Sequence, residues 1–262
     1  MAVKKTKKLS GQQLTTTVAS GETFLKVDAN GKVTRIDLPH LQSELLGGVN
    51  LDCMLDNVFI MYHPKGSSNI ALLIEPGKWT ALQNAGEIAD GVAIIEGGKV
   101  LVIAPTESDK AGLLWSSAPV NGGTTMTGGD YQKSLADFNG KANTASIISK
   151  STSSTVTNTS AYAPGFCNLY SRANANGQGL TAGKWWLPSA GEMMMIKANK
   201  NKINYCLSLI SGATLLTENW YWTSTESAEN TAMRIKMSDS QFDGHYKAQS
   251  KMQVRPVSAF MR

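Results

Sequence analysis

The sequence is poor in cysteine, in histidine and in long apolar runs. Its 262 residues include three cysteines, far apart and without C-x-x-C spacing: Cys53, Cys167 and Cys206. This odd, sparse set argues against a disulfide scaffold and against a zinc site, and it favours free thiols buried as small apolar groups. The histidines also lack a metal-binding spacing: His40, His63 and His245. We therefore expect no metal and no other cofactor.

No stretch of eighteen apolar residues occurs, so we expect no membrane insertion. Four lysines stand in the first eight residues and are followed by the largely polar residues 9–13. This start lacks the apolar core of a secretory signal, which predicts a protein made and folded in a cytosol. The formal charge of +5 is mild. A lysine run of this kind is typical of a solvated tail, so we expect no nucleic-acid partner.

The composition, 42% hydrophobic and only 7% aromatic, suits one or two loop-rich domains that contain strands. Short apolar runs predict strands at residues 58–62, 70–74, 92–95 and 100–103, with turns at 64–68, 76–77 and 97–98. Helical spacing predicts three helices, at residues 130–139, 143–148 and 162–170. Asn139-Gly140 should end the first helix, and Asn143 should cap the second. The Ser/Thr/Asn-rich residues 151–160 read as a loop. The fold class is therefore α+β, with short antiparallel strands and two or more helices.

Residues 1–48 differ from the rest and read as a small β-rich segment. Residues 14–18 are threonine-rich and β-prone, residues 24–28 and 32–36 could pair, and Asn30-Gly31 between them is a two-residue hairpin signal. A lone hairpin is not stable by itself, so it should add to its own second domain, to a sister subunit or to a partner. Residues 38–46 read as a short helix or connector that ends in a Gly47-Gly48 joint. We therefore divide the chain into residues 1–48 and 49–262.

The stretch from Gly183 to Glu192 is the strongest local signal in the chain. It predicts a short apolar strand at 185–187 that Pro188 ends. Ser189 and Glu192 have capping-box spacing, so a helix should begin at about Ala190. The helix should bury one apolar face over more than five turns: Ile196, Ile203, Leu207 and Ile210.

The last part of the chain reads as strands again. We expect strands at residues 220–225 and 233–237, a turn at Asp243-Gly244, and a last strand at 252–257. Pro256 should place that last strand at a sheet edge or beside the N-terminal part of its own domain. Trp186 and Trp222 are the best candidates for a shared aromatic core. Arg255 would be costly to bury unpaired, and its candidate partners are Glu226 and Glu192.

Four motifs follow one another in the chain: residues 139–145 (NGKANTA), 186–192 (WLPSAGE), 221–226 (YWTSTE) and 254–257 (VRPV). This series resembles a bacterial and phage domain of the pattern W-x-LP-S-x-x-E, YW-S-ST, VRPV, which is similar to the C-type-lectin fold. The resemblance covers roughly residues 85 to 262 and implies a C-type-lectin-like head over residues 49–262. The residues that it marks as fold-defining are Trp186, Pro188, Ser189, Glu192, Trp222 and Arg255.

The same fold serves enzymes, sugar-binding proteins and adhesive modules, so the resemblance leaves function open. The formylglycine-generating enzymes of this fold need reactive cysteines near their C-terminal end, and none follows Cys206. Calcium-dependent sugar binding in this fold uses a Glu-Pro-Asn type of loop. The nearest string here, Glu75-Pro76-Gly77, lies outside the matched region and lacks the amide ligand. No nucleophile elbow, phosphate loop or dinucleotide motif occurs, and we expect no enzymatic activity.

A short N-terminal anchor followed by a lectin-like head is similar to fibre and decoration proteins of phages that infect Bacteroides-type hosts. This resemblance implies a homo-trimer or homo-dimer. It also implies a capsid or tail partner for residues 1–48, and a host glycan or outer-membrane protein as receptor. Residues 226–231 and 238–249 are polar loops suited to recognition, and the residues we expect at their tips are Phe242, Asp243, His245 and Tyr246.

Three other interpretations stay open at this point. The loops after Trp220 could form an ordinary solvated hairpin. A bacterial surface adhesin would carry the same head, although it should begin with a signal peptide. A degenerate enzyme of the formylglycine-generating group would need a reactive cysteine or a metal site.

Overall fold

The computed structural model describes residues 23–27, 30–37, 57–66 and 70–260. The chain divides into two compact units, Met1–Met54 and Leu55–Arg262. In the first unit, strands β1 (Thr23–Val27) and β2 (Val33–Asp37) form an antiparallel hairpin, as predicted. Val27 pairs with Val33, so the connection is longer than the predicted two-residue turn, although it contains Asn30-Gly31. The predictions for residues 14–18, 38–46 and 47–48 lie outside the described residues.

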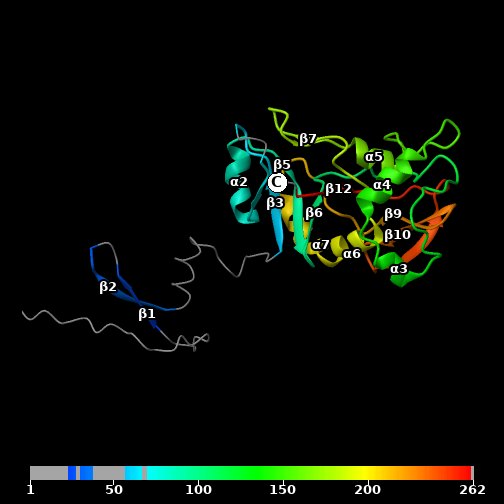
Figure 1. The fold of residues 1–262 in the computed structure, drawn as a ribbon. Coiled ribbons are helices and arrows are strands. Elements are labelled where there is room, and N and C mark those ends of the chain that lie inside the picture. Colours follow the sequence, from blue (N-terminus) through cyan, green and yellow to red (C-terminus); the bar gives the residue numbers. More distant parts are fainter. Residues whose placement is uncertain (1–22, 28–29, 38–56, 67–69, 261–262) are drawn as a thin grey trace, which may run out of the picture. The chain divides into compact units, whose positions relative to one another are not determined.

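A five-stranded antiparallel sheet organises the second unit (Figure 1). Its strand order is β12-β6-β5-β3-β4. The bounds are β3 Val58–Tyr62, β4 Leu72–Ile74, β5 Ala89–Glu96, β6 Lys99–Ile103 and β12 Val257–Ala259. The strand predicted at residues 252–257 is wrong in its bounds: residues 252 and 253 form only isolated bridges, and β12 begins at Val257, directly after Pro256. β12 does lie at the end of the sheet order, where it pairs with β6 and meets Trp186 through a single bridge. That bridge replaces the strand predicted at residues 185–187.

Helices α2 (Pro76–Asn84), α6 (Ala190–Ala198) and α7 (Lys200–Leu209) share the largest apolar core with this sheet. Pro76-Gly77, predicted as a turn, opens α2, because proline is tolerated in the first turn of a helix. The helix predicted from Ala190 begins there but breaks at Asn199. The Asn199 side chain donates to the Met195 carbonyl (3.0 Å) and to Glu96 (2.7 Å), which holds this residue between the two helices. All four predicted apolar positions of the helix are buried.

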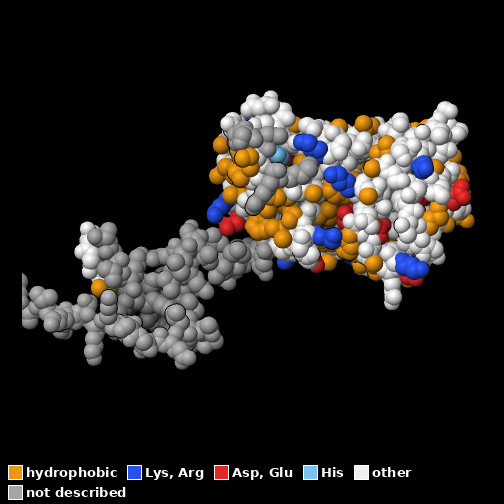
Figure 2. Space-filling model, viewed as in Figure 1, with side chains coloured by type: hydrophobic (Ala, Val, Ile, Leu, Met, Phe, Trp, Pro, Cys, Tyr) orange, Lys and Arg blue, Asp and Glu red, His pale blue; other side chains and the backbone are white. Residues whose placement is uncertain are grey.

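The opposite face of the five-stranded sheet is less fully covered. Trp185 and Leu180 pack against its centre, while Phe59, Leu73 and Val100 stay partly buried. Figure 2 shows hydrophobic side chains gathered over this region. Within the described residues, no helix is long and apolar enough to cross a membrane.

A second, three-stranded sheet has the order β11-β10-β9. The remaining elements are β9 Trp220–Ala228, β10 Thr231–Lys236, β11 Phe242–Tyr246, β7 Arg172–Ala173, β8 Gly179–Leu180, α3 Tyr131–Leu135, α4 Gly140–Ser149 and α5 Ala163–Leu169. Asp243-Gly244 is not a turn but lies within β11. The chain turns instead between β10 and β11, where Ser240 has a φ of 64°. Asn139 does not end a helix: it precedes α4, and Asn143 lies inside that helix.

The two tryptophans predicted to share a core lie in different clusters. Trp186 belongs to the core of the five-stranded sheet, because its backbone pairs with Val257. Trp222 lies on β9 and packs with Trp115 in a second cluster, where its indole N–H donates to the Leu113 carbonyl (2.9 Å). The α+β class is confirmed, but its aromatic core is divided.

Candidate functional site

Three of the four sequence motifs meet in one buried polar network. The capping box of α6 is formed, and Glu192 accepts the backbone N–H of Ser189 at 2.9 Å. The same carboxyl oxygen accepts the indole N–H of Trp186 at 3.2 Å. Burial raises the pKa of Glu192 from its usual value to about 7, and nearby Asp137 acts in the same direction. The motif around Pro188 therefore uses its polar groups to start a helix inside the core.

Asp137, just after α3, joins the other motifs to this helix start. Its carboxylate accepts the Asn143 amide (2.8 Å) and the Thr225 hydroxyl (2.6 Å). Its backbone carbonyl accepts the Ser189 hydroxyl at 2.7 Å. Residues from α4, from the N-cap of α6 and from β9 thus converge on one residue that sequence reasoning missed. The sequence placed Asp137 inside the helix predicted at residues 130–139, whereas α3 ends at Leu135, so no local signal marked it.

Arg255 is fully buried and is paired, as the cost of burying an unpaired charge required. Both predicted partners, however, were wrong. Its guanidinium pairs with Glu107 (2.9 Å) and donates to the carbonyls of Ala104 (3.0 Å) and Thr214 (2.9 Å). Glu192 is occupied at the helix start, and Glu226 pairs with another cation. Glu107 lies 148 positions away from Arg255 in the chain, so no spacing rule indicated it.

Glu226 and Lys247 form a second ion pair in which both side chains are fully buried. The Lys247 ammonium also donates to the carbonyls of Val120 (2.7 Å) and Glu229 (2.8 Å) and lies over the Trp115 ring. Burial lowers the pKa of Lys247, while Glu226 opposes that shift. This pair anchors the loop that precedes α3 and the end of β11 to β9. Both residues fall within loops expected to face a receptor.

A further pair of titratable groups lies at β3 and β5. His63 and Asp90 are buried, with 2.6 Å between Nδ1 and Oδ2, and burial raises the pKa of Asp90. Among the described residues, no group of three or more His, Cys, Asp or Glu could hold a metal ion. Cys167 and Cys206 are buried free thiols, and Cys53 lies outside the described residues.

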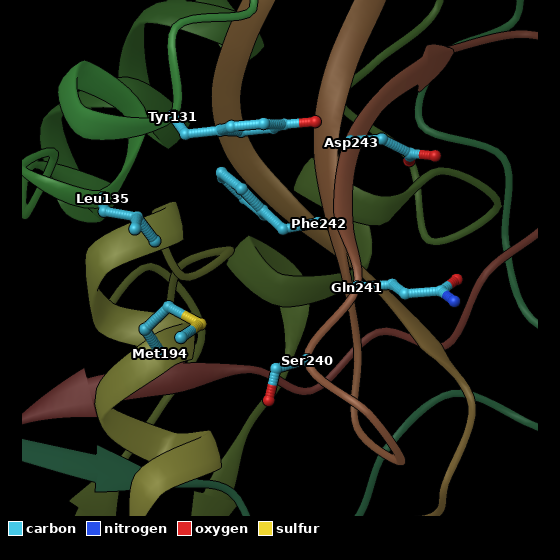
Figure 3. A pocket seen from close by; sticks show the side chains of 7 residues that line it. All are labelled: Tyr131, Leu135, Met194, Ser240, Gln241, Phe242 and Asp243. Atoms are coloured by element: carbon cyan, nitrogen blue, oxygen red, sulfur yellow. The ribbon is translucent and has the colours of Figure 1, made fainter.

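Phe242, the first of the four predicted recognition residues, lines an open groove of about 580 Å³ between α3, α6 and β11. Its ring lies 5.7 Å from that of Tyr131, centroid to centroid. Leu135 and Met194 complete the apolar wall, and Ser240 lies at one end. Figure 3 shows Gln241 and Asp243 pointing to the other side of β11, away from Leu135 and Met194. Tyr131, which sequence reasoning missed, is 57% exposed.

The other three predicted residues divide between the two faces of β11. Asp243 binds Arg234 through both carboxylate oxygens (2.7 and 3.2 Å). His245 lies on the same face as Asp243, and its Nε2 is 2.9 Å from the Ser250 hydroxyl oxygen. Burial lowers the pKa of His245, and the charge of Arg234 lowers it further. Tyr246 points to the Phe242 face and is 48% exposed. The four residues therefore share one strand but not one binding surface.

Comparison of the chain with protein-family models, with curated proteins and with solved structures gives no match.

Proposed function

We propose that the chain is a structural, non-enzymatic virion subunit, either a head or tail fibre or a capsid decoration protein of a phage. In this proposal the second unit is a C-type-lectin-like head that contacts the host surface. Residues 1–48 join copies together and dock on the capsid or the tail. The proposal rests on the resemblance carried by the four sequence motifs, and one observation in the structure supports its recognition part.

That observation is the contrast between the motifs and the groove. Polar residues of three motifs are bonded in the interior, through Asp137 and within the capping box: Asn143, Ser189, Glu192 and Thr225. The groove between α3 and β11 instead presents aromatic and apolar side chains to solvent. Chemistry needs polar groups that reach a substrate, whereas recognition needs shaped apolar surface with a few hydrogen-bonding groups. The groove is therefore the recognition site that we propose.

A saccharide is the ligand class that suits this groove best. The exposed Tyr131 ring, next to Phe242, offers a flat face on which a sugar ring can stack. The Tyr131 and Ser240 hydroxyls can hydrogen-bond to sugar hydroxyls without a metal ion. An outer-membrane protein is the alternative receptor, and it would bury the same apolar wall.

The test is binding of the purified full chain to an array of bacterial surface polysaccharides. We expect Tyr131→Ala to weaken binding to the recognised polysaccharide about tenfold, which corresponds to about 1.4 kcal/mol. The matched control is Tyr205→Ala on α7, because Tyr205 is 49% exposed and does not line the groove. Equal binding by both variants, or no binding to any polysaccharide, would contradict the proposed site.

A further inference from the structure

The outer edge of β11 is open to another strand in the part of the chain that the structure describes. β11 is the last strand in the order β11-β10-β9. The Lys236 N–H donates to the Gln241 carbonyl at 2.8 Å, and Arg234 pairs with Asp243 in the same register. Hydrogen-bonded pairs alternate along an antiparallel ladder, so the N–H and C=O groups of residues 242, 244 and 246 point away from β10. Of these groups, the Tyr246 carbonyl already accepts the Gln249 N–H at 3.5 Å, and a carbonyl has a second lone pair for a partner strand. An edge of this kind is a template for pairing.

The sequence of β11, Phe-Asp-Gly-His-Tyr, is complementary to itself when it is reversed. In an antiparallel copy centred on Gly244, Phe242 faces Tyr246 of the partner subunit. On the other face, Asp243 faces His245 of the partner subunit. Each aromatic residue thus meets an aromatic residue, and each carboxylate meets an imidazole. A strand with unlike or repelling residues at these positions would not fit a second copy in this register.

We infer that two copies of this chain pair antiparallel through β11, centred on Gly244, and so join their three-stranded sheets across a twofold axis. The outward groups of residues 242, 244 and 246 then form the hydrogen-bonded pairs of the new ladder. A twofold contact of this kind is closed, because the same surface serves both copies. The sequence left two assemblies open, a homo-dimer and a homo-trimer, and this contact favours the homo-dimer.

The side chains are placed to support this pairing. Tyr246 is exposed, and Phe242 is held in place by Tyr131, so each aromatic cross-strand pair has one fixed member. Asp243 already accepts two bonds from Arg234, but a carboxylate has about four acceptor sites, so it can accept an imidazole N–H as well. Gly244, at the axis, is exposed, so its outward N–H and C=O groups are accessible to a second strand. The place of a Cβ at Gly244 is filled by Ser227 of the same chain, on a face of the sheet and not at its edge.

In the paired dimer, each of the two copies carries one proposed receptor groove. Phe242 lines the groove on one side of β11, so the twofold axis would bring two grooves into one assembly. Two linked sites bind a repeating polysaccharide more strongly than either site alone. Only this use of the dimer rests on the proposed function, because the pairing itself is measured without a ligand.

The direct test is a cysteine pair across the axis in the full chain. In the proposed register, residue 243 and residue 245 of the partner subunit are a non-hydrogen-bonded pair, with Cα atoms about 4.5 Å apart, a separation that a disulfide spans. We expect oxidised Asp243→Cys/His245→Cys to run on a non-reducing gel at about twice the chain mass of 28.1 kDa. The reduced sample should run as a single chain.

Two controls complete the experiment. Asp243→Cys alone and the wild-type chain should give no comparable covalent dimer, since neither places two thiols opposite each other at this edge. Absence of the dimer in the double variant, or equal dimer in the single variant, would overturn the pairing. A covalent dimer that binds no polysaccharide would refute the proposed ligand and leave the pairing intact.

A second measurement uses the native strand. We expect Tyr246→Asp to weaken the self-association of the full chain, measured by sedimentation at a series of concentrations, with an unchanged circular dichroism spectrum. The contact that we propose for residues 1–48 is the same in both chains, so the difference between them reports the β11 edge. Tyr205→Asp, at a similarly exposed tyrosine on α7, should sediment as wild type does. Identical sedimentation of wild type and Tyr246→Asp would contradict the inference.

Discussion

Replacement of Lys247 by methionine should strongly destabilise the second unit. Methionine keeps most of the apolar stem but removes the ammonium that pairs with Glu226, where both side chains are fully buried. Glu226 would keep the N–H of Gly122 (2.8 Å) and the N–H and hydroxyl of Thr124 (3.2 and 2.6 Å). It would lose its only cationic partner among the described residues, and the Val120 and Glu229 carbonyls would lose a donor.

Breaking a buried ion pair by removing one partner costs about 3–5 kcal/mol. For a unit of this size, each kcal/mol lowers the melting temperature by about 2–4 °C, so we expect a drop on the order of 10 °C. Urea unfolding and thermal unfolding followed by tryptophan fluorescence measure both quantities. Glu226→Gln/Lys247→Met should be less destabilised than Lys247→Met, because the double variant leaves no buried charge.

The matched control is Lys236→Met. Lys236 forms an exposed ion pair with Asp239 at 3.0 Å, and its loss should leave the unfolding midpoint nearly unchanged. If Lys247→Met unfolded at the wild-type midpoint, the buried pair would not anchor the loops, and the reasoning would be refuted.

Two further predictions concern the helix start at Ser189. The pKa of Glu192 is raised from 4.5 to about 7 in the folded chain, so the folded state binds the proton more strongly. Its contribution to stability is therefore present below pH 4.5 and is lost as pH rises through 7, by up to about 3 kcal/mol. The fall in urea midpoint between pH 5 and pH 8 should shrink in Glu192→Gln, and an equal fall in both chains would contradict this assignment. Gly140→Ala places a Cβ against the Glu192 carboxyl and 2.8 Å from the Ser189 nitrogen, so we expect a loss of about 2 kcal/mol or more. Gly77→Ala meets open space in α2 and should be neutral or stabilising in the same unfolding assay; similar midpoints for the two alanine variants would argue against the crowding at Gly140.

Features set by neighbouring residues were predictable from the sequence. The spacing of Ser189 and Glu192 fixed the start of α6. Pro256 indicated a sheet edge, although the strand there begins after it, at Val257. Asn30-Gly31 marked the connection of the first hairpin, although that connection is longer than the predicted two-residue turn. In each case the cause lies within a few residues, in a cap, a missing N–H or a preferred turn, so it acts whatever the rest of the chain does.

Features set by distant residues were not predictable. Arg255 needed a carboxylate, but only the fold brings Glu107 to it. Asp243-Gly244 has the composition of a turn, yet Arg234 binds Asp243 and the ladder with β10 holds both residues extended. The groove depends on a contact between Tyr131 and Phe242, which lie far apart in the chain. The sequence therefore indicated Phe242 as a recognition residue but not Tyr131.

The most direct test of the proposed function is to measure the chain in purified phage particles. Particles from a culture that produces this protein would be separated on a density gradient, and the chain would be quantified by mass spectrometry against the major capsid protein. We predict that its ratio to the capsid protein stays constant across the particle peak. A chain found only in the free-protein fractions, with none in the particle peak, would contradict its role as a virion subunit.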